Sequence, residues 1–283
     1  MPASLLRPEP GPATLKITRW GGRRLAALRG APADATVGES WEFSTLPGHV
    51  SRADGRPLDD ILGGRLLFLA KLLDTASPLS VQIHPGDTDA APGKEEAWIV
   101  LAADPGACVW AGVRDGVTHT QFADAVAAGP ACLDLLARHD VSPGAVILVP
   151  ARTVHAIGGG ILLAEIQQPS DTTLRFYDHG SDRPIQPNDA LALLDLDARP
   201  VVWGPQDPPT TLRGRHVTLE ILGPGRHDRD ITTPTLLVPA RGRVRLDAQG
   251  DAEEVEPGAL RLALAPCRIV VAAGGLCVAG TVQ

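Results

Sequence analysis

Polar and apolar side chains alternate along SVQIHPGDTDAAPGKEEAW, residues 80–98. In an extended strand, residues i and i+2 lie on the same face. Two polar sets arise in this way: Ser80, Gln82 and His84 on one strand, and Lys94, Glu96 and Trp98 on the next. Glu95 points the opposite way. Burying several polar groups together is costly unless a metal or a ligand satisfies them, so this stretch predicts a binding site.

A second imidazole, His155, stands in VSPGAVILVPARTVHAIGGG, residues 141–160. A Pro-Gly turn and an apolar run precede it, which predicts a strand start near the mouth of a barrel. Two imidazoles, a carboxylate and an amide then form one mixed set: His84, His155, Glu96 and Gln82. Such a set suits Zn²⁺ and comparable divalent ions and leaves room for water or substrate. The prediction depends on the fold bringing separated strands together.

Two further charged residues interrupt apolar strands in the segment 162–184. Glu165 lies among apolar residues, and Arg175 lies in the next run. An arginine in such a strand must be paired. Asp171 or Asp178 would be ordinary partners, whereas a phosphate, a carboxylate or a developing oxyanion would make Arg175 functional.

Short β runs punctuated by glycine and proline must position these groups. The predicted strands cover residues 97–103, 145–151, 161–168, 173–178, 216–222, 234–240, 243–248, 260–266, 268–273 and 276–280. Many short, regularly spaced strands are typical of a sandwich or barrel. A Pro-rich join at 203–214 divides the chain into two predicted units, residues 1–202 and 203–283.

Helical patterns are scarce. Residues 118–140 predict two short helices that break near Gly129, with Thr120 as the cap of the first. Residues 188–196 predict another short helix, with Asn188 as its cap.

Length and composition describe an ordinary globular protein. The 283 residues allow one large or two smaller units, and 44% are hydrophobic and 21% charged. The net charge of −7 argues against a nucleic-acid partner, which would need a basic face. The 26 basic residues include only three lysines, Lys16, Lys71 and Lys94, so each retained lysine invites a functional question.

The sequence shows no pattern typical of a targeting signal, a membrane span or a disulfide framework. Residues 1–14 are Pro-rich and predict a loose arm. The first 20 residues lack the layout of a signal peptide, and no run of 18 apolar residues predicts a membrane span. The four cysteines show no CxxC pair and predict buried thiols rather than disulfides. We therefore expect a cytoplasmic protein with no membrane partner.

Six stretches taken together resemble the metal-dependent mannose-6-phosphate isomerases. They are WGG (20–22), GESWEFS (38–44), KLLDTASPLSVQIHP (71–85), GKEEAWIV (93–100), VPARTVHAIG (149–158) and LLAEIQQPSDTTLRFYDHG (162–180). They follow the family's order over the N-terminal two thirds of the chain. The large helical insertion of the long enzymes is absent, which fits the short bacterial form.

The resemblance implies a mainly β fold of two cupin-like barrel or sandwich halves with a few short helices. It implies one zinc ion, or another divalent metal, held by residues matching Gln82, His84, Glu96 and His155. It also implies interconversion of mannose 6-phosphate and fructose 6-phosphate through a cis-enediol. The remaining pocket positions are Arg175 as the catalytic arginine, Lys71, Lys94 and Glu165 within the pocket, Ser80 on the phosphate side and Trp20 in the wall.

Several alternatives stay open at the level of sequence. The proton-transfer base is Glu165, Lys94 or a water activated by the metal. Arg175 steadies the enediolate charge or shares the phosphate with Lys71 and Ser80. A metal-dependent cupin that binds a sugar phosphate without turnover is the main alternative function, and a metal-dependent oxygenase is a third. Sequence does not choose between a monomer and a homodimer.

Overall fold

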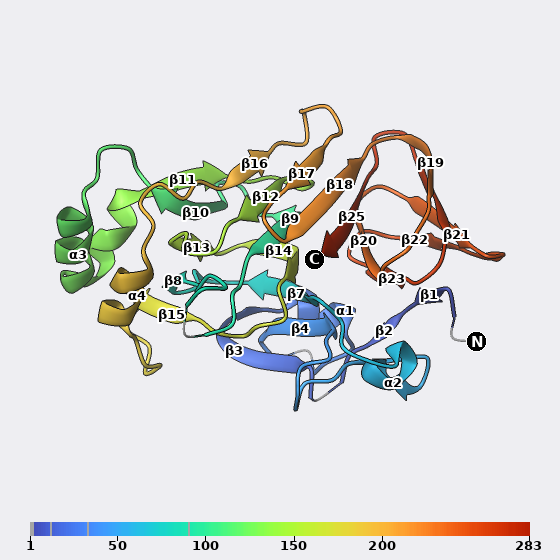
Figure 1. The fold of residues 1–283 in the computed structure, drawn as a ribbon, viewed down its shortest axis with the longest axis horizontal. Helices are drawn as coiled ribbons and strands as arrows, with labels where there is room; N and C mark the ends of the chain where they lie inside the picture. Colours follow the sequence, from blue (N-terminus) through green and yellow to red (C-terminus); the bar gives the residue numbers. More distant parts are fainter. Residues whose placement is uncertain (1–2, 12, 33, 90) are drawn as a thin grey trace.

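A seven-stranded sheet forms the centre of the molecule (Figure 1). A computed structural model describes residues 3–11, 13–32, 34–89 and 91–283. In sheet order the strands are β16 (Val201–Trp203), β12 (Val146–Val149), β9 (Glu96–Ala103), β14 (Ile161–Gln167), β7 (Leu69–Thr75), β3 (Leu15–Gly22) and β4 (Val37–Phe43). Both faces of this sheet are covered, which explains why β7, β12 and β14 are buried along their whole length.

A five-stranded sheet covers one face of the central sheet. Its order is β11 (Leu136–Asp140), β10 (Cys108–Val113), β13 (His155–Ile157), β8 (Val81–Ile83) and β15 (Leu174–Tyr177). Apolar residues of both sheets, among them Trp98, Leu163 and Val109, fill the space between them. The polar residues singled out above lie at one end of this same space.

The C-terminal strands form two more layers beyond the other face of the central sheet (Figure 1, orange and red). The six-stranded sheet is β1 (Leu5–Leu6), β23 (Arg261–Ala263), β20 (Thr235–Arg241), β25 (Leu276–Val282), β18 (Val217–Leu222) and β17 (Thr211–Arg213). The four-stranded sheet is β19 (Gly225–Arg229), β24 (Cys267–Val271), β21 (Val244–Ala248) and β22 (Asp251–Val255). The described residues thus build two pairs of facing sheets, joined by a third apolar layer.

Short helices cover the outer face of the five-stranded sheet. They are α3 (His119–Ala127), the 3₁₀ helix η1 (Gly129–Leu135) and α4 (Pro187–Leu193), whose apolar residues pack on β8 and β15. Two other helices, α1 (Arg24–Leu28) and α2 (Leu58–Leu62), lie near the N-terminal strands, as does a small sheet of β2 (Pro8–Glu9), β5 (Arg52–Ala53) and β6 (Arg56–Pro57). No helix of the described segments has the length and apolar character needed to cross a bilayer.

The mainly β prediction with a few short helices is confirmed, and its open sheets correspond to the sandwich form rather than to closed barrels. Ten predicted strands have counterparts within a few residues. The four cysteines are buried and free, as predicted. The boundary at 202/203 stays a prediction, since β1 near the N-terminus belongs to the C-terminal sheet.

Local predictions failed where a competing contact was invisible in the sequence. Thr118, not Thr120, caps α3, because it forms a capping box with Gln121. The segment 136–140 is strand β11 rather than a helix, since it pairs with β10.

Two further predictions were wrong at chain segments rich in proline. No side chain caps α4, so Asn188 has no such role. The described part of the arm over residues 1–14 is not loose, because Leu5 and Leu6 are buried and pair with β23.

Candidate metal centre and active site

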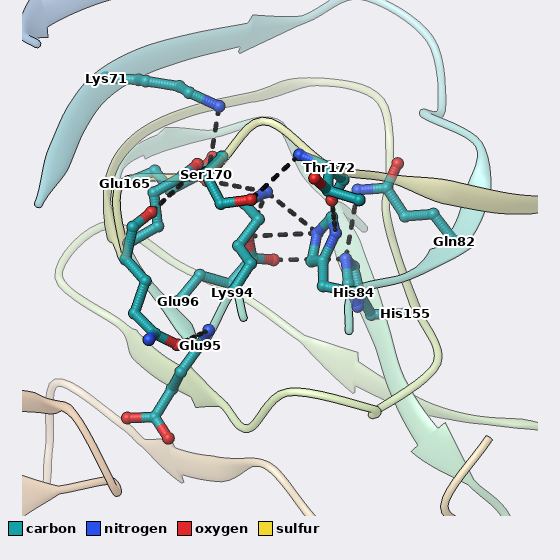
Figure 2. A network of polar contacts seen from close by, with 12 residues as sticks. Lys71, Gln82, His84, Lys94, Glu95, Glu96, His155, Glu165, Ser170 and Thr172 are labelled. Atoms are coloured by element: carbon teal, nitrogen blue, oxygen red, sulfur yellow. Dashed lines mark hydrogen bonds and ion pairs between the residues drawn. The ribbon is translucent and has the colours of Figure 1, made fainter. Parts of the chain in front are cut away.

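His84 and His155 meet where two strands of the five-stranded sheet end. His84 directly follows β8, and His155 begins β13 opposite Gln82 of β8. Their ring centroids lie 4.8 Å apart. The two ends of the loop after His84 are joined by a hydrogen bond, in which the Lys94 amide donates to the Pro85 carbonyl over 3.0 Å. The Lys94 and Glu96 side chains therefore lie beside the two imidazoles (Figure 2).

Both imidazoles are oriented by backbone carbonyls. Nδ1 of His84 donates to the carbonyl of Thr172 over 2.8 Å, and Nδ1 of His155 donates to that of Thr153 over 2.9 Å. The proton on Nδ1 leaves a lone pair on Nε2 of each ring. Such outer hydrogen bonds fix the tautomer of a metal-binding histidine.

Glu96 completes the cluster from the central sheet. Its Oε2 lies 3.4 Å from Nε2 of His84, and its Oε1 lies 3.3 Å from Nε2 of His155. All three side chains are buried, and one donor atom from each lies within 4.8 Å of the others. Among the described residues this is the cluster of His, Cys, Asp and Glu that could hold a metal ion.

Lys94 contacts the same donor atoms. Its Nζ is 3.0 Å from Nε2 of His84 and 2.8 Å from Oε2 of Glu96. Burial disfavours the ammonium, but Glu96 and then Glu165 outweigh it and raise the pKa of Lys94. A divalent cation would compete with this ammonium for two lone pairs.

The electrostatics keep the cluster in metal-binding form. Burial, and then the charge of Lys94, lowers the pKa of His84 to about 3. Burial also lowers the pKa of His155. Although burial opposes ionisation of Glu96, Lys94 foremost holds its pKa well below the usual range. Neutral imidazoles and a carboxylate are the protonation states that bind divalent metals.

The donor spacing fits a small divalent ion. Ligand bonds of about 2.0–2.1 Å around a tetrahedral zinc place neighbouring donor atoms about 3.3–3.4 Å apart. The separations of Glu96 from the two imidazole nitrogens match this value. The residues present therefore fit the metal that the sequence predicts.

Gln82 and Ser80 lie at the rim of the cluster. The side-chain Nε2 of Gln82 is 3.2 Å from Nε2 of His155, and its Oε1 accepts from the Ser80 hydroxyl over 2.9 Å. Ser80 thus contacts the amide of Gln82 directly. A half-turn of that amide would present its oxygen to the cluster instead.

Glu165 lies between the two lysines of the pocket. Its Oε1 is 3.8 Å from Nζ of Lys71 and 3.6 Å from Nζ of Lys94, yet this oxygen accepts no hydrogen bond from any residue that the structure describes. Burial raises the pKa of Glu165 to about 7, although both lysines oppose the shift. Lys71 has a second carboxylate neighbour, Glu39, at 3.7 Å. A buried carboxylic acid that titrates near neutrality and has a free oxygen is suited to proton transfer.

Arg175 reaches the site without a partner of its own. It pairs in register with Gln82 across β15 and β8, so it shares that residue's face of the sheet. Its Nε is buried and makes no hydrogen bond, and within the described chain no carboxylate lies within ion-pair distance. The ordinary partner, Asp178, binds Arg183 instead through two contacts of 2.7 Å.

These groups surround a small cavity of about 70 Å³. Its lining is Trp20, Glu39, Lys71, Leu73, Leu79, Ser80, Gln82, Lys94, Glu96, Ile157, Glu165, Thr173, Arg175 and Arg183. A more open hollow of about 610 Å³ shares Trp20 and Arg183 with it. The residues that the sequence proposed as metal ligands, substrate-binding residues and catalytic residues therefore all lie at the cavity or in the adjoining metal cluster, whereas Lys16 does not line it.

Two charged residues that line this cavity were not predicted as site residues from the sequence. Glu39 stands in the quoted stretch GESWEFS, but nothing local distinguishes it from an exposed strand carboxylate. Arg183 follows Asp178 in an irregular loop, so no strand alternation could place it.

Comparison with known proteins identifies relatives of this chain. No family model matches it. It is 38% identical to the mannose-6-phosphate isomerase of Streptococcus mutans over an alignment of 182 residues. This alignment covers 56% of this chain and 57% of that protein. It is 34% identical to the mannose-6-phosphate isomerase ManA of Bacillus subtilis over the same shares. The chain thus spans little more than half the length of the curated relatives it matches.

Solved structures extend the likeness to the whole fold. The mannose 6-phosphate isomerase of Bacillus subtilis aligns with a TM-score of 0.76 and 21% identity over 98% of this chain and 99% of that one. The apo enzyme of Salmonella typhimurium aligns with a TM-score of 0.72 and 16% identity over all of both chains. The chain is therefore similar to mannose-6-phosphate isomerases over part of its sequence and shares the fold of these solved structures throughout.

Proposed function

We propose that this protein is a metal-dependent aldose–ketose isomerase that interconverts mannose 6-phosphate and fructose 6-phosphate. One observation carries the proposal: a His–Glu–His cluster adjoins a cavity that is lined by its glutamate, by a carboxylic acid that titrates near pH 7 and by an arginine with no ion-pair partner among the described residues. The curated relatives support the same reaction by name. We expect the cytoplasm as its compartment.

His84, Glu96 and His155 would hold the metal, with zinc as the proposed ion and Gln82 as a fourth ligand after its amide turns. When bound, the ion supplies Lewis acidity that polarises the carbonyl and hydroxyl oxygens of the sugar. Lys94 would then give up its contacts with His84 and Glu96 and remain beside Glu165, 3.6 Å away.

Proton transfer falls to Glu165 in this proposal. Isomerisation moves a proton between C1 and C2, which requires one group that can take it and return it. The carboxylate of Glu165 is present near pH 7 and has a free oxygen, whereas carboxylate neighbours keep Lys94 protonated. These facts favour Glu165 over Lys94 as the base.

Several cationic side chains of the cavity could bind the enediolate oxygen and the phosphate of the substrate. Arg175 would stabilise the enediolate oxygen, because its guanidinium shares a face with Gln82 beside the metal cluster. Lys71 and Ser80 would bind the phosphate, with Arg183 added at the opening of the cavity.

A coupled assay with mannose 6-phosphate tests this function. We expect turnover that a chelator abolishes and that added Zn²⁺ restores. Glu96→Gln should lose both the zinc and the turnover, because it removes the anionic ligand. Tight binding of mannose 6-phosphate without turnover would instead show a sugar-phosphate binding protein.

Arg183→Ala is expected to raise the KM for mannose 6-phosphate by about 10-fold or more, because a charge-assisted contact with phosphate contributes about 1.5–3 kcal/mol. Zinc content should not change. Asp178→Asn is the companion variant: it frees Arg183 from its ion pair and should not raise KM. An unaltered KM in Arg183→Ala would remove this residue from the phosphate site.

A further inference from the structure

Glu95 points out of the active site into the C-terminal part of the chain. Strand alternation sends Lys94 and Glu96 into the cavity and Glu95 toward the other face, where Ala97 and Ile99 pack against the six-stranded sheet. In Figure 2 its carboxylate is directed away from the two imidazoles. It is nevertheless buried, with 3% of its surface exposed.

Three backbone amides at the start of β18 hold this carboxylate. Oε2 accepts from the amide of Arg215 over 3.0 Å, and Oε1 accepts from those of His216 and Val217 over 3.0 and 2.8 Å. We call these amides the 215–217 cradle. Gly214 borders it so closely that a Cβ there would overlap Oε1 of Glu95.

The same turn also reaches the segment that carries His84. Asp87, three residues after His84, accepts from Nε2 of His216 over 2.6 Å. Gln168 joins the two segments: its Nε2 donates to Asp87 over 3.1 Å, and its Oε1 accepts from the Glu95 amide over 2.8 Å. Two ligand-bearing segments are therefore fastened to one turn of the C-terminal strands.

We propose that Glu95 is a positioning residue, through which the C-terminal strands hold Glu96 and Lys94 in place for metal binding. This rests on the proposed function only in taking His84, Glu96 and His155 as the metal ligands. Residues on both sides of Glu95 enter the cavity, so a shift of its anchored backbone would displace both. The C-terminal part thus stabilises the geometry of the metal centre as well as covering the central sheet.

Two variants test the proposal by different routes. Glu95→Gln keeps the shape but offers one acceptor oxygen to three amide donors. Gly214→Ala keeps Glu95 and its charge but fills the space its carboxylate needs. We expect each to weaken Zn²⁺ binding by about 10- to 100-fold, as loss of outer contacts of metal ligands does. Competition with a chelator measures the affinity on the full chain, and the Co²⁺ spectrum reports the ligand geometry.

Matched controls separate positioning from general destabilisation. Glu253→Gln changes another carboxylate of the C-terminal strands, one that pairs with Arg261, and Gly223→Ala brings a Cβ within 2.7 Å of Pro209. Both controls should lower Tm while Zn²⁺ affinity stays at the wild-type value. Equal Zn²⁺ affinity in Glu95→Gln, Gly214→Ala and wild type would overturn the proposal. These measurements need no turnover, so zinc binding without isomerisation would defeat the proposed function alone.

Discussion

Glu165→Gln is expected to lower kcat for mannose 6-phosphate by about 10²- to 10⁴-fold, the usual contribution of a general acid–base group. Glutamine has nearly the same shape as glutamate but cannot take up a proton at neutral pH. The variant should bind zinc normally, because Glu165 contacts Lys71 and Lys94 rather than the metal cluster. Stopped assays of both reaction directions, with zinc content measured in parallel, check this result.

The pH dependence gives a second readout of the same group. Burial raises the pKa of Glu165 to about 7, and the base must be ionised to act, so kcat/KM should fall as the pH drops through this region. A bound divalent cation favours the carboxylate and moves the fall to lower pH. The acid limb should vanish in Glu165→Gln, apart from the part that protonation of the sugar phosphate itself causes near pH 6.

Retention of the acid limb in Glu165→Gln, or a loss of less than about 10-fold in kcat, would contradict this role. Lys94→Met is the comparison that then decides between the remaining bases. If Lys94 only places an ammonium beside Glu165, removing it should shift the pH at which kcat/KM falls, without abolishing turnover. Abolished turnover with normal zinc content would make Lys94 the base.

Strand alternation accounts for most of what the sequence could predict of the site. The period of two is strict in a strand, so SVQIH and KEEAW fix which side chains share a face before any fold is known. The opposite directions of Glu95 and Glu96 follow from this rule and are seen in their contacts. Buried strands can also be recognised by their apolar composition, which explains why β9, β14 and β25 were predicted to within two residues at each end.

Contacts between distant segments lay beyond the sequence. The pairing of Leu5 and Leu6 with β23 joins residues more than 250 positions apart, and no local pattern encodes it. Arg183 reaches the cavity from an irregular loop, where no periodicity fixes the direction of a side chain. The 215–217 cradle consists of backbone amides, which carry no residue signature at all.

The sequence could not decide whether Arg175 has an ion-pair partner within the protein. Asp171 and Asp178 are both near it in the chain, and either could have neutralised it. Arg183 binds Asp178 through two hydrogen bonds, and in the described part of the chain the buried Nε of Arg175 has no acceptor. Burial, and then the charge of Arg183, lowers the pKa of Arg175. Arg175 is half-buried, and leaving its buried Nε without an acceptor among the described residues costs stability, so an anion that arrives during the reaction would relieve this cost.

Arg175→Ala is therefore expected to lower kcat by about 10²- to 10³-fold, the loss found when a donor to a developing oxyanion is removed. Zinc content should remain at the wild-type level, and Tm should stay near the wild-type value, because the half-buried Arg175 makes no ion pair with the described residues and its Nε has no acceptor there. Arg175→Lys should recover only part of kcat, since an ammonium keeps the charge but lacks the planar fork.

The pattern of loss tells the possible roles of Arg175 apart. A fall in kcat with little change in KM assigns the residue to the enediolate, whereas a rise in KM alone assigns it to the phosphate. Arg138→Ala removes an exposed arginine that pairs with Asp140 and should change neither constant. Parallel loss of zinc and turnover in Arg175→Ala would mean that this residue maintains the strand pair β8–β15 beneath the metal cluster and takes no part in the chemistry.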